Sequence, residues 1–141
     1  MKKFLSPFPL LQDAGLAMVR IIVGYFMIYH GLEVFDEKIM NDYLKWDQFK
    51  AFSSPAFMVY MGKTAELVGG IFLMTGLFTR FAALVLIFTM TYVSFFVGQG
   101  RVWYEDQHPF MFVLFGVVFF FIGGGKYSVD KLIFSNVKNL A

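Results

Sequence analysis

The sequence predicts an all-α integral membrane protein, in which four transmembrane helices form an antiparallel bundle with a short interfacial segment between the first and the second. The first observation is composition: of 141 residues, 58% are hydrophobic, only 16% are charged and 20 are phenylalanine. The second is that four apolar stretches occupy residues 14–35, 58–77, 79–97 and 109–123. Because a helix needs about 20 apolar residues to cross a bilayer, we expect a single transmembrane domain over residues 1–141.

The connections between the spans are short, which favours antiparallel neighbours. The second and third spans are joined only by the residues around Leu77–Arg80, so they must form a tight helical hairpin. The fourth span begins at Pro109, a residue that suits the first position of a helix. It ends at the glycine run 123–125, because glycine accepts the left-handed backbone of a helix C-cap.

Two segments outside the spans are predicted to lie along the membrane surface. Between the first and second spans, apolar residues recur at roughly helical spacing among alternating charges: Ile39, Met40, Tyr43, Leu44, Trp46 and Phe49. This pattern is typical of an amphipathic helix, with Trp46 at the depth of the lipid headgroups. The tail resembles a second short interfacial helix, with Ser128 as its N-cap and Asp130 in its first turn.

The basic residues outside the spans predict the orientation. One side of the membrane takes six of them: Lys2, Lys3, Arg80, Lys126, Lys131 and Lys138. The other side takes four, together with most of the acidic residues: Lys38, Lys45, Lys50 and Arg101. Since basic residues accumulate in cytoplasmic loops, we expect both termini in the cytoplasm and both Trp46 and Trp103 on the outer side.

The second span also carries a strip of glycine. Gly62, Gly69 and Gly76 recur every seven residues, and Gly70 lies beside them. Small residues on one face allow another backbone to approach closely. We therefore expect this face to be a helix-packing surface.

Ionisable residues inside the spans form a candidate intramembrane polar site, because charges at bilayer depth are costly unless they face protein or water. At about 1.5 Å of rise per residue, Glu66 lies near the midplane and Lys63 about 7 Å toward the outer side. His30 lies about 8 Å toward the outer side, and Arg20 about 7 Å toward the cytoplasm. Tyr92 falls in the same central or outer half, and it completes the candidate site.

Each of these residues also has a structural interpretation. Lys63 and Glu66 are three residues apart on one helix and can simply neutralise each other. Arg20 can bond carbonyls, or extend its long stem toward the interface. Glu33 lies near the end of its span and is interpreted as interfacial. Glu66 is the strongest functional candidate, since an ionisable residue at this depth indicates a functional site by default.

The cofactor hypotheses are a quinone and, with much less support, a haem. His30 and His108 fall at depths that differ by only about 4 Å, so a haem between their imidazoles is geometrically conceivable. No haem-attachment motif supports it, and no metal site is predicted. The chain contains no cysteine, which excludes disulfides, thiol redox chemistry and iron–sulfur clusters held by this chain alone. A scattered net charge of +2 gives no indication of nucleic acid as a partner.

Three motifs lie within residues 14–134: Arg20-x-x-x-Gly24 with His30-Gly31; Glu66-x-x-Gly69-Gly70 leading to Gly76-Leu77-x-Thr79-Arg80; and Gly125-Lys126-Tyr127-Ser128-Val129-Asp130. With them the chain resembles the DoxX family of small bacterial four-span membrane proteins. The resemblance implies a four-helix fold in the inner membrane, and it marks family-pattern positions: Arg20, Glu66, Gly69, Gly70 and Arg80. The family takes its name from a subunit associated with a terminal quinol oxidase, and related proteins are linked to membrane redox and oxidative-stress complexes.

Together these observations favour an accessory subunit of a membrane redox, respiratory or oxidative-stress assembly over a stand-alone enzyme. In this hypothesis Lys63 and Glu66 bind or relay protons, and Tyr92 or His30 donates a hydrogen bond to a quinone carbonyl. One alternative is a structural scaffold that binds a larger membrane complex. Another is a small-solute or proton transporter, which four spans support less well because they enclose little volume without oligomerising. The expected partners are the lipid bilayer and either other membrane subunits or further copies of this chain.

Overall fold

The computed structural model describes residues 7–135, and every regular element in that range is helical. The elements are α1 (Gln12–Gly31), η1 (Leu32–Phe35), α2 (Glu37–Tyr43), α3 (Asp47–Lys50), α4 (Pro55–Thr75), α5 (Thr79–Tyr92), η2 (Val93–Val97), α6 (Gln107–Ile122) and α7 (Val129–Phe134). Three segments are long and apolar enough to cross a membrane, namely Gln12–Phe35, Pro55–Thr75 and Thr79–Val97, and α6 is a shorter apolar helix. The predicted all-α class is thereby confirmed, and the first three predicted spans correspond to candidate membrane-spanning helices. Lys2, Lys3 and Lys138, used above to predict orientation, lie outside the described residues.

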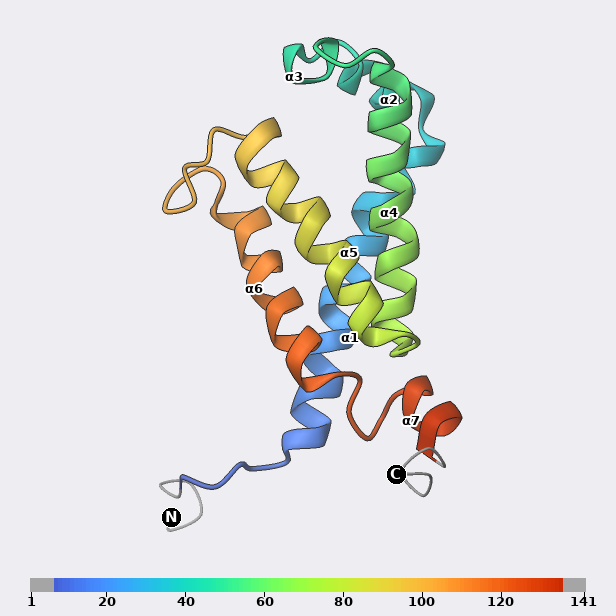
Figure 1. Ribbon diagram of the computed structural model, residues 1–141, viewed down its shortest axis with the longest axis vertical. Coiled ribbons are helices and arrows are strands. Elements are labelled where there is room, and N and C mark those ends of the chain that lie inside the picture. The colour runs from blue at the N-terminus through green and yellow to red at the C-terminus, as the bar shows by residue number, and fades with distance from the viewer. Residues whose placement is uncertain (1–6, 136–141) are drawn as a thin grey trace.

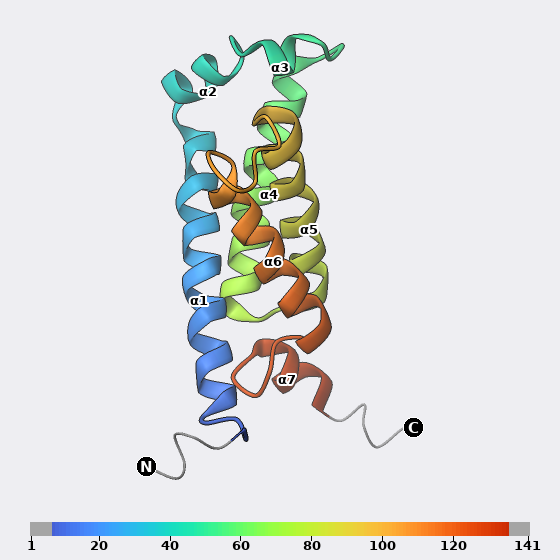
Figure 2. The same ribbon diagram turned by 90° about the vertical axis from the view of Figure 1, so that its left-hand side faces the viewer.

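The four long helices lie side by side, and the chain reverses direction from each one to the next (Figure 2). α1 packs chiefly against α4, and α5 packs against both α6 and α4. The short helices α2 and α3 lie together at one end, called here the upper end, and α7 lies at the opposite, lower end (Figure 1). The long helices therefore connect two structurally distinct ends.

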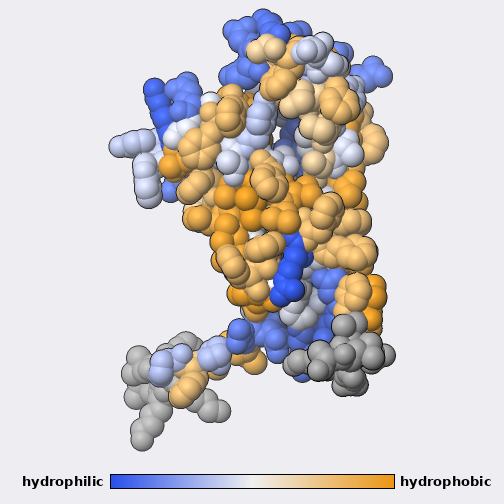
Figure 3. Space-filling model, in the orientation of Figure 1, coloured by the Kyte–Doolittle hydropathy of each residue, from blue (hydrophilic) through white to orange (hydrophobic). Residues whose placement is uncertain are grey.

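The outer faces of the long helices are apolar. Large hydrophobic side chains point outward along them, including Phe88 of α5, which is 70% exposed, and Phe121 of α6, which is 73% exposed. Figure 3 shows this apolar surface over the middle of the molecule, with hydrophilic residues gathered toward both ends. A helix in water would carry polar residues on its outer face, so these faces are suited to lipid.

Glycines allow α1 and α4 to touch backbone to backbone. A Cβ atom added at Gly70 of α4 would lie 2.8 Å from the backbone nitrogen of Ile28 and 2.9 Å from the carbonyl oxygen of Gly24. Gly24 and Gly31 of α1 are equally crowded by the backbone of α4, at Met74 and Leu67. Gly70 thus lies at a close backbone contact between α4 and α1, and this contact depends on partner glycines in α1.

The other glycines of the predicted strip behave differently from one another. A Cβ atom added at Gly69 would lie 3.1 Å from the side chain of Val85 on α5, so Gly69 serves the contact between α4 and α5. Gly76 has a left-handed backbone (φ 71°) and ends α4, as glycine does at a C-cap. A Cβ atom at Gly62 would meet no atom within 4 Å. Gly62 therefore makes no close helix contact within residues 7–135.

Arg20 and the tail fasten the lower end. The Arg20 side chain is only 1% exposed, and it donates to the carbonyl oxygens of Leu73 and Met74 at the end of α4 and of Tyr127 before α7. These carbonyls include the unpaired acceptors that every helix C-terminus leaves. Asp130 accepts hydrogen bonds from the backbone nitrogens that start α5, at 2.7 and 2.8 Å. Asp130 lies in the first turn of α7, as predicted. Through Asp130 and the carbonyl oxygen of Tyr127, the tail ties the α4–α5 hairpin to α1.

The segment between the first two spans folds as the two short helices α2 and α3. Asp36 caps α2 by accepting from the backbone nitrogens of Lys38 and Ile39. Met40 and Phe49, two of the apolar residues in the amphipathic pattern, are buried against Val59 near the start of α4. The predicted helical character is confirmed, and its apolar side faces the upper ends of the long helices.

The α1–α4 contact generates a stability prediction. Gly70→Ala places a methyl group against backbone atoms that cannot rotate away, so we expect it to lower the free energy of unfolding by about 1–3 kcal/mol. The measurement is thermal unfolding of the purified protein in a mild detergent.

Gly62→Ala on the same helix is the matched control. Because the site is open, the alanine should be neutral or stabilising by about 0.5–1 kcal/mol through helix propensity. Equal melting temperatures for the two variants would contradict the proposed backbone contact.

Candidate functional site

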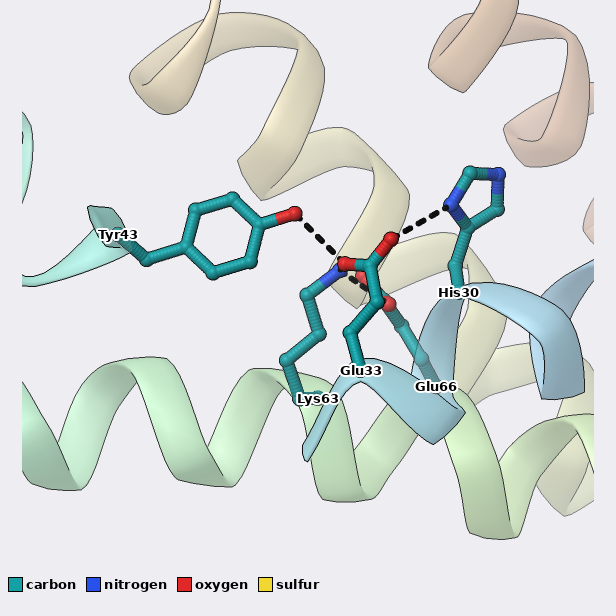
Figure 4. Close-up of polar contacts among 5 residues, drawn as sticks. All are labelled: His30, Glu33, Tyr43, Lys63 and Glu66. Atoms are coloured by element: carbon teal, nitrogen blue, oxygen red, sulfur yellow. Dashed lines mark hydrogen bonds and ion pairs between the residues drawn. The ribbon is translucent and has the colours of Figure 1, made fainter. Parts of the chain in front are cut away.

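A cluster of ionised side chains joins α1 to α4 in the upper half of the molecule (Figure 4). The Lys63 ammonium lies 2.9 Å from a carboxylate oxygen of Glu33 and 3.0 Å from one of Glu66. Lys63 and Glu66 project from neighbouring turns of α4, whereas Glu33 comes from η1, directly after α1. One lysine is therefore shared between two carboxylates from different elements.

Two further groups surround Glu33. The hydroxyl of Tyr43, on α2, donates to a Glu33 oxygen at 2.6 Å. His30 Nδ1 lies 3.7 Å from the other Glu33 oxygen. The Lys63 ammonium also lies over the Tyr43 ring, 4.9 Å from its centroid, in a cation–π arrangement. Glu33 is thus the centre of the cluster, and Tyr43 links it to the helices that cover the upper end.

The cluster is largely shielded from solvent. The Glu66 side chain is 6% exposed, that of Lys63 14% and that of Glu33 22%. Burial of Tyr43, reinforced by its hydrogen bond to Glu33, raises the pKa of this tyrosine above its ordinary value. Tyr43 therefore remains a protonated donor at neutral pH. Two carboxylates against one ammonium leave one negative charge in excess in their formal states.

A cavity of about 250 Å³ lies beside the cluster. Its walls are mostly apolar and aromatic, and they come from α1, α4, α5, α6 and the covering helices α2 and α3. Polar side chains reach it from several of these elements: His30, Tyr43, Lys63, Glu66, Tyr92 and His108. An apolar cavity with a few convergent polar groups is the usual form of a small-molecule site.

The helix wall next to the cavity is locally irregular. After α5, residues Val93–Val97 form a π-helical turn, η2, and Ser94 bonds back to the carbonyl oxygen of Met90 at 2.8 Å. Tyr92 stacks on Phe96 across this turn, with ring centroids 5.3 Å apart. Single π-turns inside helices frequently occur at functional sites. Here the turn lies at the point where Tyr92 and Val93 line the cavity.

The structure brings the two histidines together. The rings of His30 and His108 meet edge to face with centroids 6.1 Å apart, and His108 packs in the same way on Phe112 at 5.2 Å. Within residues 7–135, no group of three or more histidine, cysteine or acidic side chains is arranged to hold a metal ion. Both imidazoles are in contact with aromatic rings, and His30 also adjoins the Glu33 carboxylate.

Four of the five residues predicted for the polar site line the same cavity: His30, Lys63, Glu66 and Tyr92. Arg20 does not belong with them, because its guanidinium is bound to carbonyls at the lower end of α4. Glu33, interpreted from the sequence as interfacial, lies beside this cavity and its carboxylate binds Lys63. A signal for Glu33 was its spacing of three residues from His30, which places both on one helix face.

Sequence similarity to known proteins identifies the family of this chain. The DoxX family profile matches residues 15–99 of the chain. An uncharacterised protein of Haemophilus influenzae is 32% identical over 126 residues, covering 84% of this chain and 90% of that protein. A Bacillus subtilis protein named "Putative oxidoreductase CatD" is 24% identical over 134 residues, covering 90% and 92% of the two chains. No solved structure matches. The profile match spans more than half of the sequence, and the chain therefore belongs to the DoxX family of small membrane proteins.

Proposed function

We propose that the chain is a four-span protein of the bacterial inner membrane, in which α6 also crosses the bilayer. Its 16 residues extend about 24 Å as a helix, and the turns at either end can make up the remaining depth. α6 contains no Asp, Glu, Lys or Arg, and it packs along α5. A helix that is apolar on all sides has no favourable place on a water-exposed surface. These features support an antiparallel transmembrane bundle of α1, α4, α5 and α6.

The proposed orientation places both termini and α7 in the cytoplasm. The lower end carries Arg80, Lys126 and Lys131, whereas the upper end carries most of the acidic residues outside the spans. The bias toward basic residues in cytoplasmic segments supports this assignment. The charge cluster and its cavity then lie in the outer half of the membrane.

The proposed function is that of an accessory subunit in a membrane redox or oxidative-stress assembly, with a quinone as the ligand of the cavity. The observation that carries this proposal is the juxtaposition of the largely shielded Glu33–Lys63–Glu66 cluster with an aromatic-walled cavity between the long apolar helices. A bound quinone supplies two-electron, two-proton redox chemistry. The name of the Bacillus subtilis relative, "Putative oxidoreductase CatD", is consistent with such a role.

The side chains around the cavity suit the two ends of a quinone ring. Lys63, Tyr92 and the imidazoles can donate hydrogen bonds toward carbonyl oxygens. Glu66 and a neutral imidazole can accept a hydrogen bond or a proton. Because the cluster holds one carboxylate more than its ammonium neutralises, it can take up a proton without creating excess positive charge. His30 then offers a route for that proton toward the upper surface, since it is partly exposed and adjoins Glu33.

The subunit role follows from what this chain provides for electron transfer. It has no cysteine, and hence no thiol pair and no cysteine-held iron–sulfur cluster. In the proposed assembly, a partner subunit supplies or accepts the electrons. The alternative of a scaffold built on glycine faces receives less support, because Gly24, Gly31 and Gly70 are occupied by the contact between α1 and α4.

The topology can be tested with single cysteines, since the natural chain has none. Asn41→Cys and Tyr104→Cys, at the upper end, should react with an impermeant maleimide in intact cells. Ser135→Cys, after α7, should react only once the membrane is permeabilised. Reaction of all three in intact cells would remove α6 as a span, and labelling of Ser135→Cys alone would reverse the orientation.

Quinone binding can be tested by fluorescence, because the chain has only two tryptophans and Trp46 lines the cavity. In a Trp103→Phe background, decylubiquinone should quench Trp46 along a saturable curve. Glu66→Gln in that background should weaken the apparent affinity about tenfold or more, through loss of a charged hydrogen-bond partner.

The matched control is Trp46→Phe, which leaves Trp103, a residue 82% exposed on the loop before α6. Its quenching should rise linearly with quinone in the detergent micelle. Saturable curves of equal midpoint from both tryptophans would contradict binding in the cavity.

A third test separates assembly from function in the charge cluster. Lys63→Met leaves the buried Glu66 carboxylate and the partly buried Glu33 carboxylate without their shared ammonium, so we expect a loss of about 3–5 kcal/mol in the free energy of unfolding. The triple variant Glu33→Gln, Lys63→Met, Glu66→Gln removes all three charges and should recover most of that stability. It should still fail to bind decylubiquinone. Recovery of both stability and quinone binding would mean that the charges serve assembly alone.

A further inference from the structure

A second hollow, of about 720 Å³, opens at the lower end of the molecule, away from the charge cluster. It lies where the start of α5, the end of α6 and the helix α7 meet. Apolar side chains form most of its wall, among them Phe78, Phe81, Ile122 and Phe134. Two cationic side chains, Arg80 and Lys131, also line it. The hollow thus combines an apolar wall with positive charge.

The two cations are available to a ligand. Arg80 uses its Nε to donate to the carbonyl oxygen of Phe120 at 3.2 Å, which fixes the side chain beside the end of α6. In the described part of the chain, neither Arg80 nor Lys131 forms an ion pair. The terminal nitrogens of Arg80 and the ammonium of Lys131 therefore remain as unused donors next to the hollow.

Asp130, the acidic residue that lines the hollow, does not neutralise Arg80 or Lys131 by forming an ion pair with either of them. Both carboxylate oxygens of Asp130 accept hydrogen bonds from the backbone nitrogens of Phe78 and Thr79. Asp130 thereby balances the positive end of α5. What faces an incoming ligand is a guanidinium and an ammonium.

The surroundings determine what kind of anion fits. Phe81 is 61% exposed and Ile122 46% exposed on the outer faces of α5 and α6, so the wall of the hollow continues into the apolar surface of the bundle. Figure 3 shows hydrophilic surface reaching into the apolar region over the lower end of α5. A small inorganic anion would leave the apolar wall uncovered. A molecule with a charged head and hydrocarbon chains would cover both parts.

We propose that this hollow is a binding site for an anionic phospholipid. Arg80 and Lys131 hold the phosphate, and the acyl chains lie along Phe81 and Ile122. A guanidinium binds phosphate through two parallel N–H donors, and basic pockets at the ends of transmembrane helices are suited to anionic headgroups. This site is independent of the quinone proposal and lies at the opposite end of the helices.

The test is native mass spectrometry of the full-length, delipidated protein in mild detergent, with phosphatidylglycerol and phosphatidylcholine of identical acyl chains. The wild type should retain phosphatidylglycerol in preference to phosphatidylcholine. Arg80→Gln and Lys131→Gln should each lower that preference about fivefold, and the two together by more. Equal retention of the two lipids by the wild type would overturn the proposal.

Two further arms make the test specific. The control variant combines Lys45→Gln with Arg101→Gln and removes the same formal charge at the upper end. It should leave the preference for phosphatidylglycerol unchanged. An equal loss of that preference would show general charge attraction instead of a specific site. Excess glycerol phosphate should not displace the lipid, and complete displacement would assign the site to a soluble phosphate. If variants of Arg80 do not fold, Lys131→Gln alone decides the test. The Lys131 side chain makes no hydrogen bond or ion pair within residues 7–135, so its replacement should not disturb the fold. An unchanged lipid preference in Lys131→Gln would refute the proposal.

Discussion

The backbone contact between α1 and α4 is the constraint on which the rest of the structure depends. Gly24 and Gly31 on one helix and Gly70 on the other leave no room for a Cβ atom. Helices in a membrane gain little from the hydrophobic effect when they associate, so such close approach supplies van der Waals contact instead. It also decides the chemistry of the upper half, because Glu33 can reach Lys63 only if η1 is held directly against α4.

The two ends of this helix pair each hold a shielded cation, and the cation is stabilised differently at each end. At the lower end, Arg20 finds neutral carbonyl oxygens at the end of α4, so one cation is stabilised by backbone dipoles and the helix gains a cap. At the upper end, Lys63 is held between two carboxylates. The first arrangement ties the fold together through the two terminal nitrogens of Arg20, although the buried Nε has no hydrogen-bond partner within residues 7–135. The second leaves a carboxylate in excess beside a cavity, where it can still take part in chemistry.

Local patterns in the sequence predicted the spans, the hairpin at Leu77–Arg80 and the N-cap at Ser128, since each depends on neighbouring residues. These local patterns did not predict which residues contact one another across helices. Glycine in the second span was recognised as a packing signal, yet Gly62 faces open space while Gly24 supplies the contact. The rotation of α4 about its axis decides this, and α1 sets that rotation. The place of Tyr43 in the site also depends on tertiary structure. α2 folds over the ends of the long helices, and this brings the Tyr43 hydroxyl to Glu33.

Stability alone gives a poor account of the upper cluster. Replacing a buried ion pair by well-packed apolar residues is often neutral or stabilising, whereas removing one partner is strongly destabilising. A chain that needed only a tight α1–α4 contact could achieve it with the glycines and an apolar seam. The cluster instead meets the cavity, the π-helical turn η2 and the hydroxyl of Tyr43 at one place. This convergence is what a ligand with polar ends requires, and it is why we propose the ligand site at this end of the molecule.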